Sequence, residues 1–169
     1  IPVVRQWMKD YKIPAYDEDK GTGIVRHIMG RTGVHSGEIM VCIVTAVPMV
    51  PHMKELVQML RKDVPGLTSV IQNINSRHTN VILGNKTKVI YGSPTISDSI
   101  GDLSFRISAQ SFFQVNSEQA QKLYDTALSY ADLKGNETVV DVYCGTGTIT
   151  LFLAKRAKFA YGIEIVEPA

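Results

Sequence analysis

One stretch near the end of the chain decides the fold: Asp141-Val142-Tyr143-Cys144-Gly145-Thr146-Gly147. The apolar run 138–140 precedes it, and residues 149–154 follow it with apolar side chains at helical spacing. This order predicts a strand, a glycine turn and a helix. Gly145 and Gly147 allow tight backbone geometry and close approach of a ligand, and the amides at the helix start face the same cavity. The stretch therefore predicts a nucleotide-type cofactor pocket.

The acidic residue at the strand end indicates which cofactor the pocket suits. The carboxylate of Asp141 would repel a pyrophosphate and attract a positively charged ligand. S-adenosyl-L-methionine carries such charge on its ammonium and sulfonium groups. The third glycine of the dinucleotide fingerprint is replaced by Thr150. Both observations favour methyl transfer and disfavour a nicotinamide dehydrogenase.

A second acidic residue ends the next expected strand, at residues 159–164. Glu164 comes seventeen residues after Gly147, where a carboxylate can accept hydrogen bonds from both hydroxyls of an adenosyl ribose. The alternative is a surface acid at a strand end. Strand, helix and strand in this order predict a parallel crossover at the start of a Rossmann-like sheet.

The preceding part of the chain is expected to form an α+β domain. Residues 24–31 and 38–45 have strand composition, and residues 53–60 have helical spacing between Pro51 and Pro65-Gly66. Further strands are expected at 68–74, 88–91 and 103–108, with a short one at 81–83. A helix with one apolar face is expected from Ala120 to Ala131, with Asn116 and Gln119 resembling a capping box.

The fold class is therefore α/β, in three segments. Residues 1–19 are polar and interrupted by prolines, so we expect a connector with little core. Residues 20–105 form the central α+β domain, and residues 106–169 the first part of a Rossmann-like methyltransferase domain. The first 105 residues hold twelve Lys and Arg against nine Asp and Glu, and the rest hold six against seven. RNA contact is thus expected in the central domain, where the polar loop 73–80 either meets RNA or is a solvated turn.

Composition excludes several classes of protein. Hydrophobic residues make up 44% and charged residues 20% of the chain, which is typical of a globular protein. No apolar run is long enough to span a bilayer, so a cytoplasmic location is expected. The histidines are scattered and the two cysteines are far apart, which predicts no metal site. Cys42 lies in an apolar run and is expected in the core, and Cys144 is expected to be structural.

A second motif precedes the glycine stretch by about thirty residues: Gln110-Ser111-Phe112-Phe113-Gln114-Val115-Asn116. With the glycine stretch and the run Gly162-Ile163-Glu164-Ile165-Val166-Glu167, it resembles the RNA uracil-C5 methyltransferases, which form 5-methyluridine in 23S rRNA or tRNA. The resemblance implies S-adenosyl-L-methionine as cofactor. It also implies that the pocket is lined by Gln114, Tyr143, Thr148 and Glu164 and shaped by Asp141, Gly145 and Gly147. At least one of Phe112 and Phe113 is expected to be core packing.

The resemblance also implies a mechanism. In such enzymes a cysteine thiolate adds to C6 of uracil, C5 takes the methyl group, and a carboxylate base removes the C5 proton. Family members carry that cysteine and base beyond the second strand, so no catalytic residue is assigned within these residues. Family members often add an N-terminal RNA-binding barrel, and some an iron–sulfur cluster. The chain is thus expected to be an inactive fragment of a longer enzyme, with 23S rRNA favoured over tRNA as substrate.

Two other functions stay open from the sequence. One is a methyltransferase for a protein or a small molecule, which would have no reason to carry residues 112–116. The other is an RNA-binding module without catalysis, in which residues 20–105 bind RNA and the chain binds no cofactor.

Overall fold

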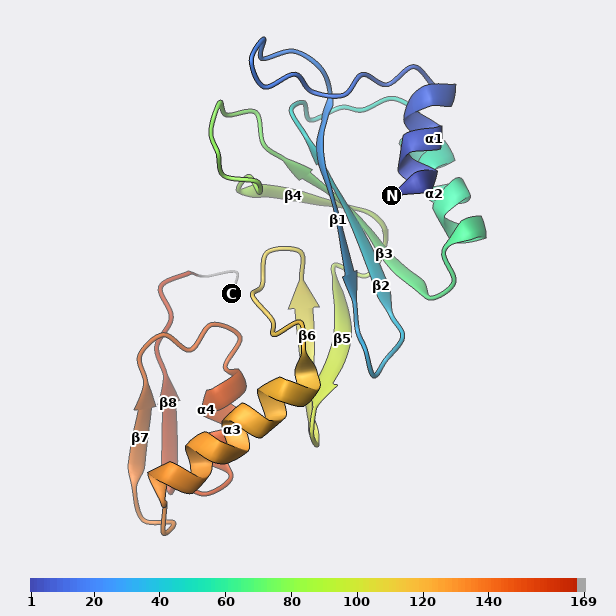
Figure 1. Ribbon diagram of the computed structural model, residues 1–169. Helices are drawn as coiled ribbons and strands as arrows, with labels where there is room; N and C mark the ends of the chain where they lie inside the picture. The colour runs from blue at the N-terminus through green and yellow to red at the C-terminus, as the bar shows by residue number, and fades with distance from the viewer. Residues whose placement is uncertain (167–169) are drawn as a thin grey trace. The chain divides into compact units, whose positions relative to one another are not determined.

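A computed structural model describes residues 1–166 and divides the chain into two compact units (Figure 1). The first unit contains residues 1–33 and 37–96, and the second contains residues 34–36 and the chain from Ser97 onward. Residues 34–36 group with the second unit because the Asp98 carboxylate of that unit accepts hydrogen bonds from the backbone N–H groups of Val34 (3.0 Å) and His35 (2.9 Å). The fold class is mixed α/β, as predicted.

The first unit is built on a four-stranded sheet in the order β1-β2-β3-β4, with these bounds: β1 Val25–Thr32, β2 Ile39–Thr45, β3 Leu67–Ile74 and β4 Lys86–Gly92. β1 and β2 are antiparallel, β2 and β3 are parallel, and β3 and β4 are antiparallel. The parallel step needs a crossover connection, which helix α2 (Met53–Asp63) supplies. The four main strands predicted from composition are confirmed to within two residues, and the predicted helix begins at Met53 as expected and extends three residues further, to Asp63.

Helix α1 (Pro2–Asp10) corrects the expectation for residues 1–19. Val4 and Trp7 are 1% and 0% exposed and belong to the main core with Leu56 and Leu60 of α2. The Trp7 indole N–H also donates to the carbonyl of His52, at 2.8 Å. The prediction of little core in this segment was wrong, because a short amphipathic helix with two buried side chains looks polar overall in composition.

The short strand expected at 81–83 does not form. The side-chain amide of Asn75 donates to the carbonyls of Val81 (2.7 Å) and Ile82 (3.2 Å). Those carbonyls therefore accept hydrogen bonds from a side chain and not from the backbone of a neighbouring strand.

The second unit contains these elements: β5 Thr95–Ile100, which starts at the boundary, β6 Leu103–Ser108, α3 Ser117–Ala131, β7 Thr138–Asp141, α4 Thr148–Ala154 and β8 Phe159–Gly162. β5, which the sequence reading missed, pairs with β6 across the turn at Gly101. The contact boundary between the two compact units lies at Ile96 and Ser97.

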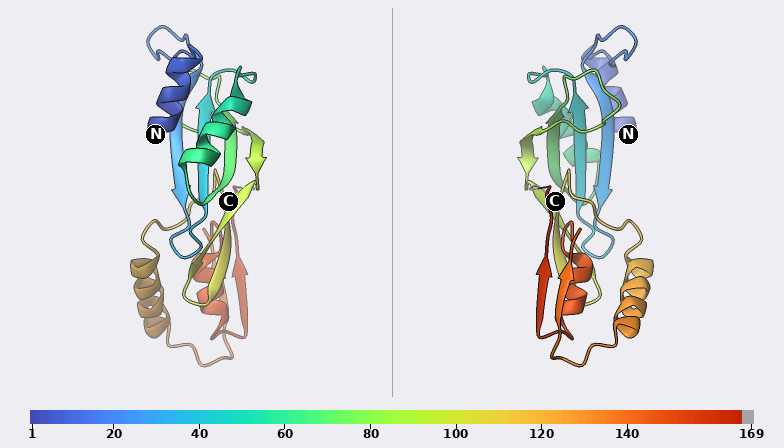
Figure 2. Two further views of the ribbon diagram at one scale, coloured as in Figure 1. Left: turned by 90° about the vertical axis from the view of Figure 1, so that its right-hand side faces the viewer. Right: turned by 90° about the vertical axis from the view of Figure 1, so that its left-hand side faces the viewer.

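The last three elements form the expected strand, helix and strand. β7 and β8 pair in parallel, with Asp141 opposite Gly162 at the carboxyl ends. Helix α4 packs against both strands, as the views of Figure 2 also show. Helix α3 begins at the predicted cap, where the Asn116 side chain accepts from the N–H of Gln119 at 3.0 Å. The start of a Rossmann-like sheet is thus present in the second unit.

Candidate functional site

The glycine turn between β7 and α4 has the backbone that its sequence predicts. Gly145 and Gly147 have φ angles of +54° and +79°, in the left-handed region that disfavours other residues. A Cβ atom built on either glycine would meet nothing within 4 Å. The turn is closed by a hydrogen bond from the Gly147 N–H to the Cys144 carbonyl, at 2.8 Å. Its glycines therefore leave open space in which a ligand can approach the backbone.

Glu164 lies against this turn, although nineteen residues separate it from Gly145. One carboxylate oxygen accepts from the Gly145 N–H at 3.0 Å, and the other accepts from the Val166 N–H at 2.8 Å. These backbone donors, Val166 first and then Gly145, hold the pKa of the exposed Glu164 carboxyl below its usual range. An ionised carboxylate has about four acceptor positions, so it can accept further hydrogen bonds from a ligand.

Asp141 is held at the carboxyl end of β7 by a contact with α4. Its carboxylate accepts a hydrogen bond from the Thr150 hydroxyl at 2.6 Å, and its backbone carbonyl accepts from the Ile163 N–H at 2.8 Å. The side chain is partly buried. Thr150 thus orients the acidic group. In the sequence this threonine is notable only because it replaces the third glycine of the fingerprint, so its role as a donor becomes visible only in the structure.

Thr148 is the first residue of α4 and faces α3. Its hydroxyl lies 2.9 Å from the hydroxyl of Tyr124, and the Tyr124 ring packs on Phe152 at 5.1 Å between ring centroids. Tyr124 was predicted only as part of an apolar helix face. Its hydroxyl was the available signal, since a buried tyrosine needs a polar partner.

The segment 110–116 reaches the same turn through its backbone. The Thr146 hydroxyl donates to the carbonyl of Phe112 at 3.4 Å, while the Phe112 ring is 71% exposed. Phe113 packs against Phe105 of β6, which confirms that one of the two phenylalanines is core packing. Gln114 is partly exposed and Tyr143 is 88% exposed. The structure thus places this segment beside the turn, and ligand contacts of Gln114 and Tyr143 stay predictions.

Neither cysteine has the surroundings of a nucleophile. Cys42 is fully buried in β2, and burial raises the pKa of its thiol to about 11. The Cys144 sulfur packs over Gly162, since a Cβ on that glycine would lie 2.8 Å from it. The structural roles predicted for both residues fit these contacts.

Within residues 1–166, no group of three or more His, Cys, Asp and Glu side chains is arranged to hold a metal ion. In the same residues, no helix has the length and apolar character needed to cross a membrane. Glu167, which ends the run quoted from Gly162, lies outside the described residues.

Comparison with known proteins places this chain beside RNA-modifying enzymes, although no protein-family model matches it. An uncharacterized RNA methyltransferase of Halalkalibacterium halodurans is 50% identical over 169 residues, which is 100% of this chain and 37% of that protein. A protein of the same description from Caldanaerobacter subterraneus is 51% identical over the same coverage. The chain therefore spans little more than a third of the relatives it matches.

A solved structure is similar over most of the chain. It is the tRNA (uracil-54, C5)-methyltransferase of Pyrococcus abyssi in complex with S-adenosyl-L-homocysteine, with 26% identity and a TM-score of 0.76. The match covers 96% of this chain and 38% of that chain. The mixed α/β fold described above is thus similar to that of an S-adenosylmethionine-dependent methyltransferase.

Proposed function

We propose that this chain is part of an S-adenosyl-L-methionine-dependent RNA (uracil-C5) methyltransferase. The observation that carries the proposal is the hydrogen bond from the Gly145 N–H to Glu164, at 3.0 Å. It joins the glycine turn after β7 to the acidic residue after β8, at the carboxyl edge where parallel sheets bind nucleotides. The similarity to an enzyme solved with S-adenosyl-L-homocysteine supports the same reading.

In this proposal S-adenosyl-L-methionine is the cofactor, and it supplies the methyl group when bound. Glu164 accepts hydrogen bonds from the ribose hydroxyls, and Asp141 faces the positively charged end. Gly145 and Gly147 provide room along the backbone, and Gln114, Tyr143 and Thr148 complete the lining. The open space at both glycines and the free acceptor positions on Glu164 fit such a ligand.

The substrate in this proposal is a uridine in RNA, methylated at C5. Support comes from the names of the relatives, which are RNA methyltransferases, and from the uracil-C5 enzyme with a similar fold. The motif 110–116, whose Phe112 carbonyl contacts the glycine turn, adds to this support. The nucleophile and the base are assigned to no residue of this chain, since Cys42 is buried with a raised pKa and Cys144 packs on Gly162.

The cofactor half of the proposal is tested by calorimetry with S-adenosyl-L-homocysteine on the full-length protein. Asp141→Ala and Glu164→Ala are each expected to weaken binding by at least about ten-fold, because each removes a charged acceptor. Asp125→Ala removes an exposed acid from α3 of the same unit and is the matched control. Unchanged affinity in both site variants would refute the pocket assignment.

The substrate half is tested by release of tritium from RNA labelled at uracil C5. Methylation at C5 replaces the hydrogen there, so tritium must appear in water in step with methyl incorporation. Methyl transfer to RNA without tritium release would contradict uracil-C5 chemistry. Transfer to protein or to a small molecule, with no transfer to RNA, would contradict an RNA substrate.

A further inference from the structure

The loop that joins β3 to β4, residues 75–85, borders an open cavity of about 550 Å³ in the first unit. Apolar side chains of Pro48 and Ile74 form one part of its lining, and Ser76, Arg77 and Lys86 form another. Ligand cavities of this size and mixed character are common in proteins. The candidate cofactor residues described above belong to the second unit, and none of them lines this cavity.

Two buried asparagines give this loop a defined backbone. The Asn73 side chain is fully buried and pairs with Gly84, donating to its carbonyl at 2.8 Å and accepting from its N–H at 2.7 Å. Asn75 is 2% exposed and binds the carbonyls of Val81 and Ile82. Buried side chains of Asn73, in β3, and Asn75, just after β3, therefore fix the backbone of the loop.

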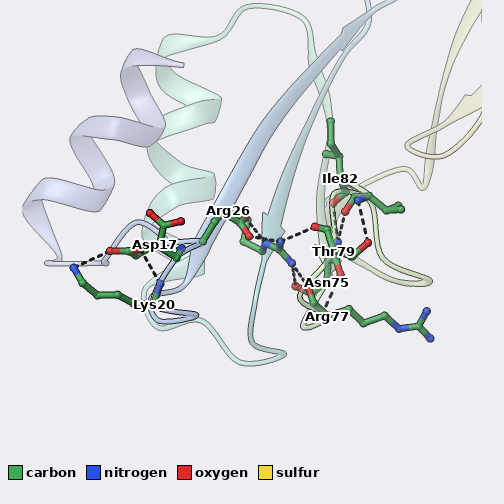
Figure 3. Close-up of polar contacts among 10 residues, drawn as sticks. Asp17, Lys20, Arg26, Asn75, Arg77, Thr79 and Ile82 are labelled. Carbon is green, nitrogen blue, oxygen red and sulfur yellow. Dashed lines mark hydrogen bonds and ion pairs between the residues drawn. The ribbon is translucent and has the colours of Figure 1, made fainter.

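Arg26 of β1 holds the other half of the loop (Figure 3). Its guanidinium donates to the carbonyls of Asn75 (2.9 Å) and Arg77 (2.7 Å), and it pairs with both carboxylate oxygens of Glu18. The Arg26 side chain is only 1% exposed, so its charge serves the Glu18 pair and the loop carbonyls and does not reach the surface. Charge-assisted hydrogen bonds from one buried cation to the carbonyls of Asn75 and Arg77 restrain the conformation of this part of the loop.

The loop and the strand that follows it carry three exposed cations. Figure 3 shows the Arg77 side chain extending away from the Arg26 network. Lys86 begins the edge strand β4 and is exposed, as is Lys88. Residues 64–97 contain these three cations and no Asp or Glu. The cavity lining therefore combines positive charge with no acidic side chain.

A second, neighbouring cavity differs from the first in the charge of its lining. It has a volume of about 480 Å³ and is lined by Glu18, Asp19, His27, His78 and their neighbours Thr79 and Asn80. Its lining contains no Lys or Arg, the Glu18 carboxylate is already paired with Arg26, and the Asp19 carboxylate would repel a polyanion. An anionic ligand is thus favoured on the Arg77 and Lys86 side of the loop and disfavoured on the other.

We propose that the cavity beside Arg77 and Lys86 binds a single-stranded segment of RNA outside the modified uridine. Arg77 and Lys86 contact phosphates, Ser76 meets a base edge, and the apolar surface of Ile74 and Pro48 packs on a base face. A pre-ordered loop favours this binding because little conformational entropy is lost. The inference rests on the proposed function for its choice of RNA as the polyanion.

The test measures binding of a fluorescein-labelled single-stranded oligouridylate to the full-length protein over a series of potassium chloride concentrations. Arg77→Ala/Lys86→Ala is expected to weaken binding at low salt by about ten-fold. It is also expected to reduce the slope of log affinity against log salt by about 1.4, for two phosphate contacts on a single strand. Both residues are exposed, and an unchanged melting temperature is the check that folding is retained.

The matched control is Lys9→Ala/Lys62→Ala, which removes two exposed lysines from α1 and α2 of the same unit. The inference is overturned if both double variants lose affinity and slope equally, or if neither does. Competition by polyglutamate as effective as by unlabelled oligouridylate would also overturn it, because the surface would then bind any polyanion.

Tritium release by the wild-type protein separates this inference from the proposed function. If the wild type releases tritium from labelled RNA and the Arg77 and Lys86 variant binds RNA normally, only this cavity is misassigned. If the wild type releases none, the proposed function fails whatever the loop variants do.

Discussion

At the scale of single residues, Glu164 illustrates how one side chain joins distant parts of the sequence. Both of its carboxylate oxygens accept backbone hydrogen bonds, from Gly145 and from Val166. In Glu164→Gln the amide supplies only one acceptor oxygen, so one of these N–H groups loses its partner. We expect weaker binding of S-adenosyl-L-homocysteine in this variant, measured by calorimetry, and affinity close to wild type would show that the carboxylate charge is dispensable.

The lowered pKa of the Glu164 carboxyl predicts how cofactor affinity depends on pH. Because its folded pKa is lowered, its stabilising contacts are complete above the usual glutamate range and are lost as pH falls through the lowered value. The ratio of wild-type to Glu164→Gln affinity should therefore stay constant between neutral and mildly acidic pH. A ratio that already falls near neutral pH would contradict the lowered pKa.

Gly162 is a position where added volume has a predictable effect. A Cβ there would lie 2.8 Å from the Cys144 sulfur, so Gly162→Ala should lower the free energy of unfolding by about 1–3 kcal/mol, the usual range for overpacking. Cys144→Ala in the same chain removes the nearest atom and should restore part of the loss. Urea denaturation of the single and double variants measures this coupling, and additive effects would contradict the contact.

At the scale of elements, α4 is attached to β7 through the Thr150 hydroxyl and the Asp141 carboxylate. Thr150→Val preserves the shape of the side chain and leaves the partly buried carboxylate without this donor. We expect a loss of about 1–3 kcal/mol in the free energy of unfolding, together with weaker cofactor binding. Thr126→Val, on the exposed surface of α3, is the control.

Helix α1 is joined to the first unit by Trp7, which is fully buried. Trp7→Ala should lower the free energy of unfolding by about 3–5 kcal/mol. Trp7→Phe keeps most of the ring and removes only the hydrogen bond to the His52 carbonyl, so its loss should be smaller. Chemical denaturation followed by circular dichroism compares the two, and a mild effect of Trp7→Ala would contradict a core role for α1.

At the scale of the whole molecule, the nature of the RNA target is the remaining prediction. We propose 23S rRNA, from the resemblance found in the sequence, whereas the similar solved structure is an enzyme of tRNA. In cells lacking the gene, mass spectrometry of rRNA and tRNA digests should show loss of one 5-methyluridine from 23S rRNA, restored by the wild-type gene. Loss from tRNA instead would correct the substrate and retain the chemistry.

Local sequence patterns were sufficient to predict most of the strands and helices. Strand composition predicted β1 and β2, and an apolar run predicted β7. Helical spacing predicted α2 and α3, because each of these helices buries one face. The same patterns failed for α1, where only two residues of a short polar segment are buried, and for residues 81–83, whose carbonyls bind Asn75. β5 was missed although Ile96, Asp98 and Ile100 alternate before Gly101.

By itself, the sequence determined the glycine turn, the two acidic strand ends and the parallel strand order, because glycine conformation and apolar periodicity are local properties. Only the tertiary structure decided which groups meet: Glu164 with the Gly145 amide, Thr150 with Asp141, and Arg26 with the loop that carries Arg77. These partners are nine to fifty-one residues apart in the chain. Such hydrogen bonds depend on the folded backbone bringing donor and acceptor within about 3 Å, which no local pattern encodes.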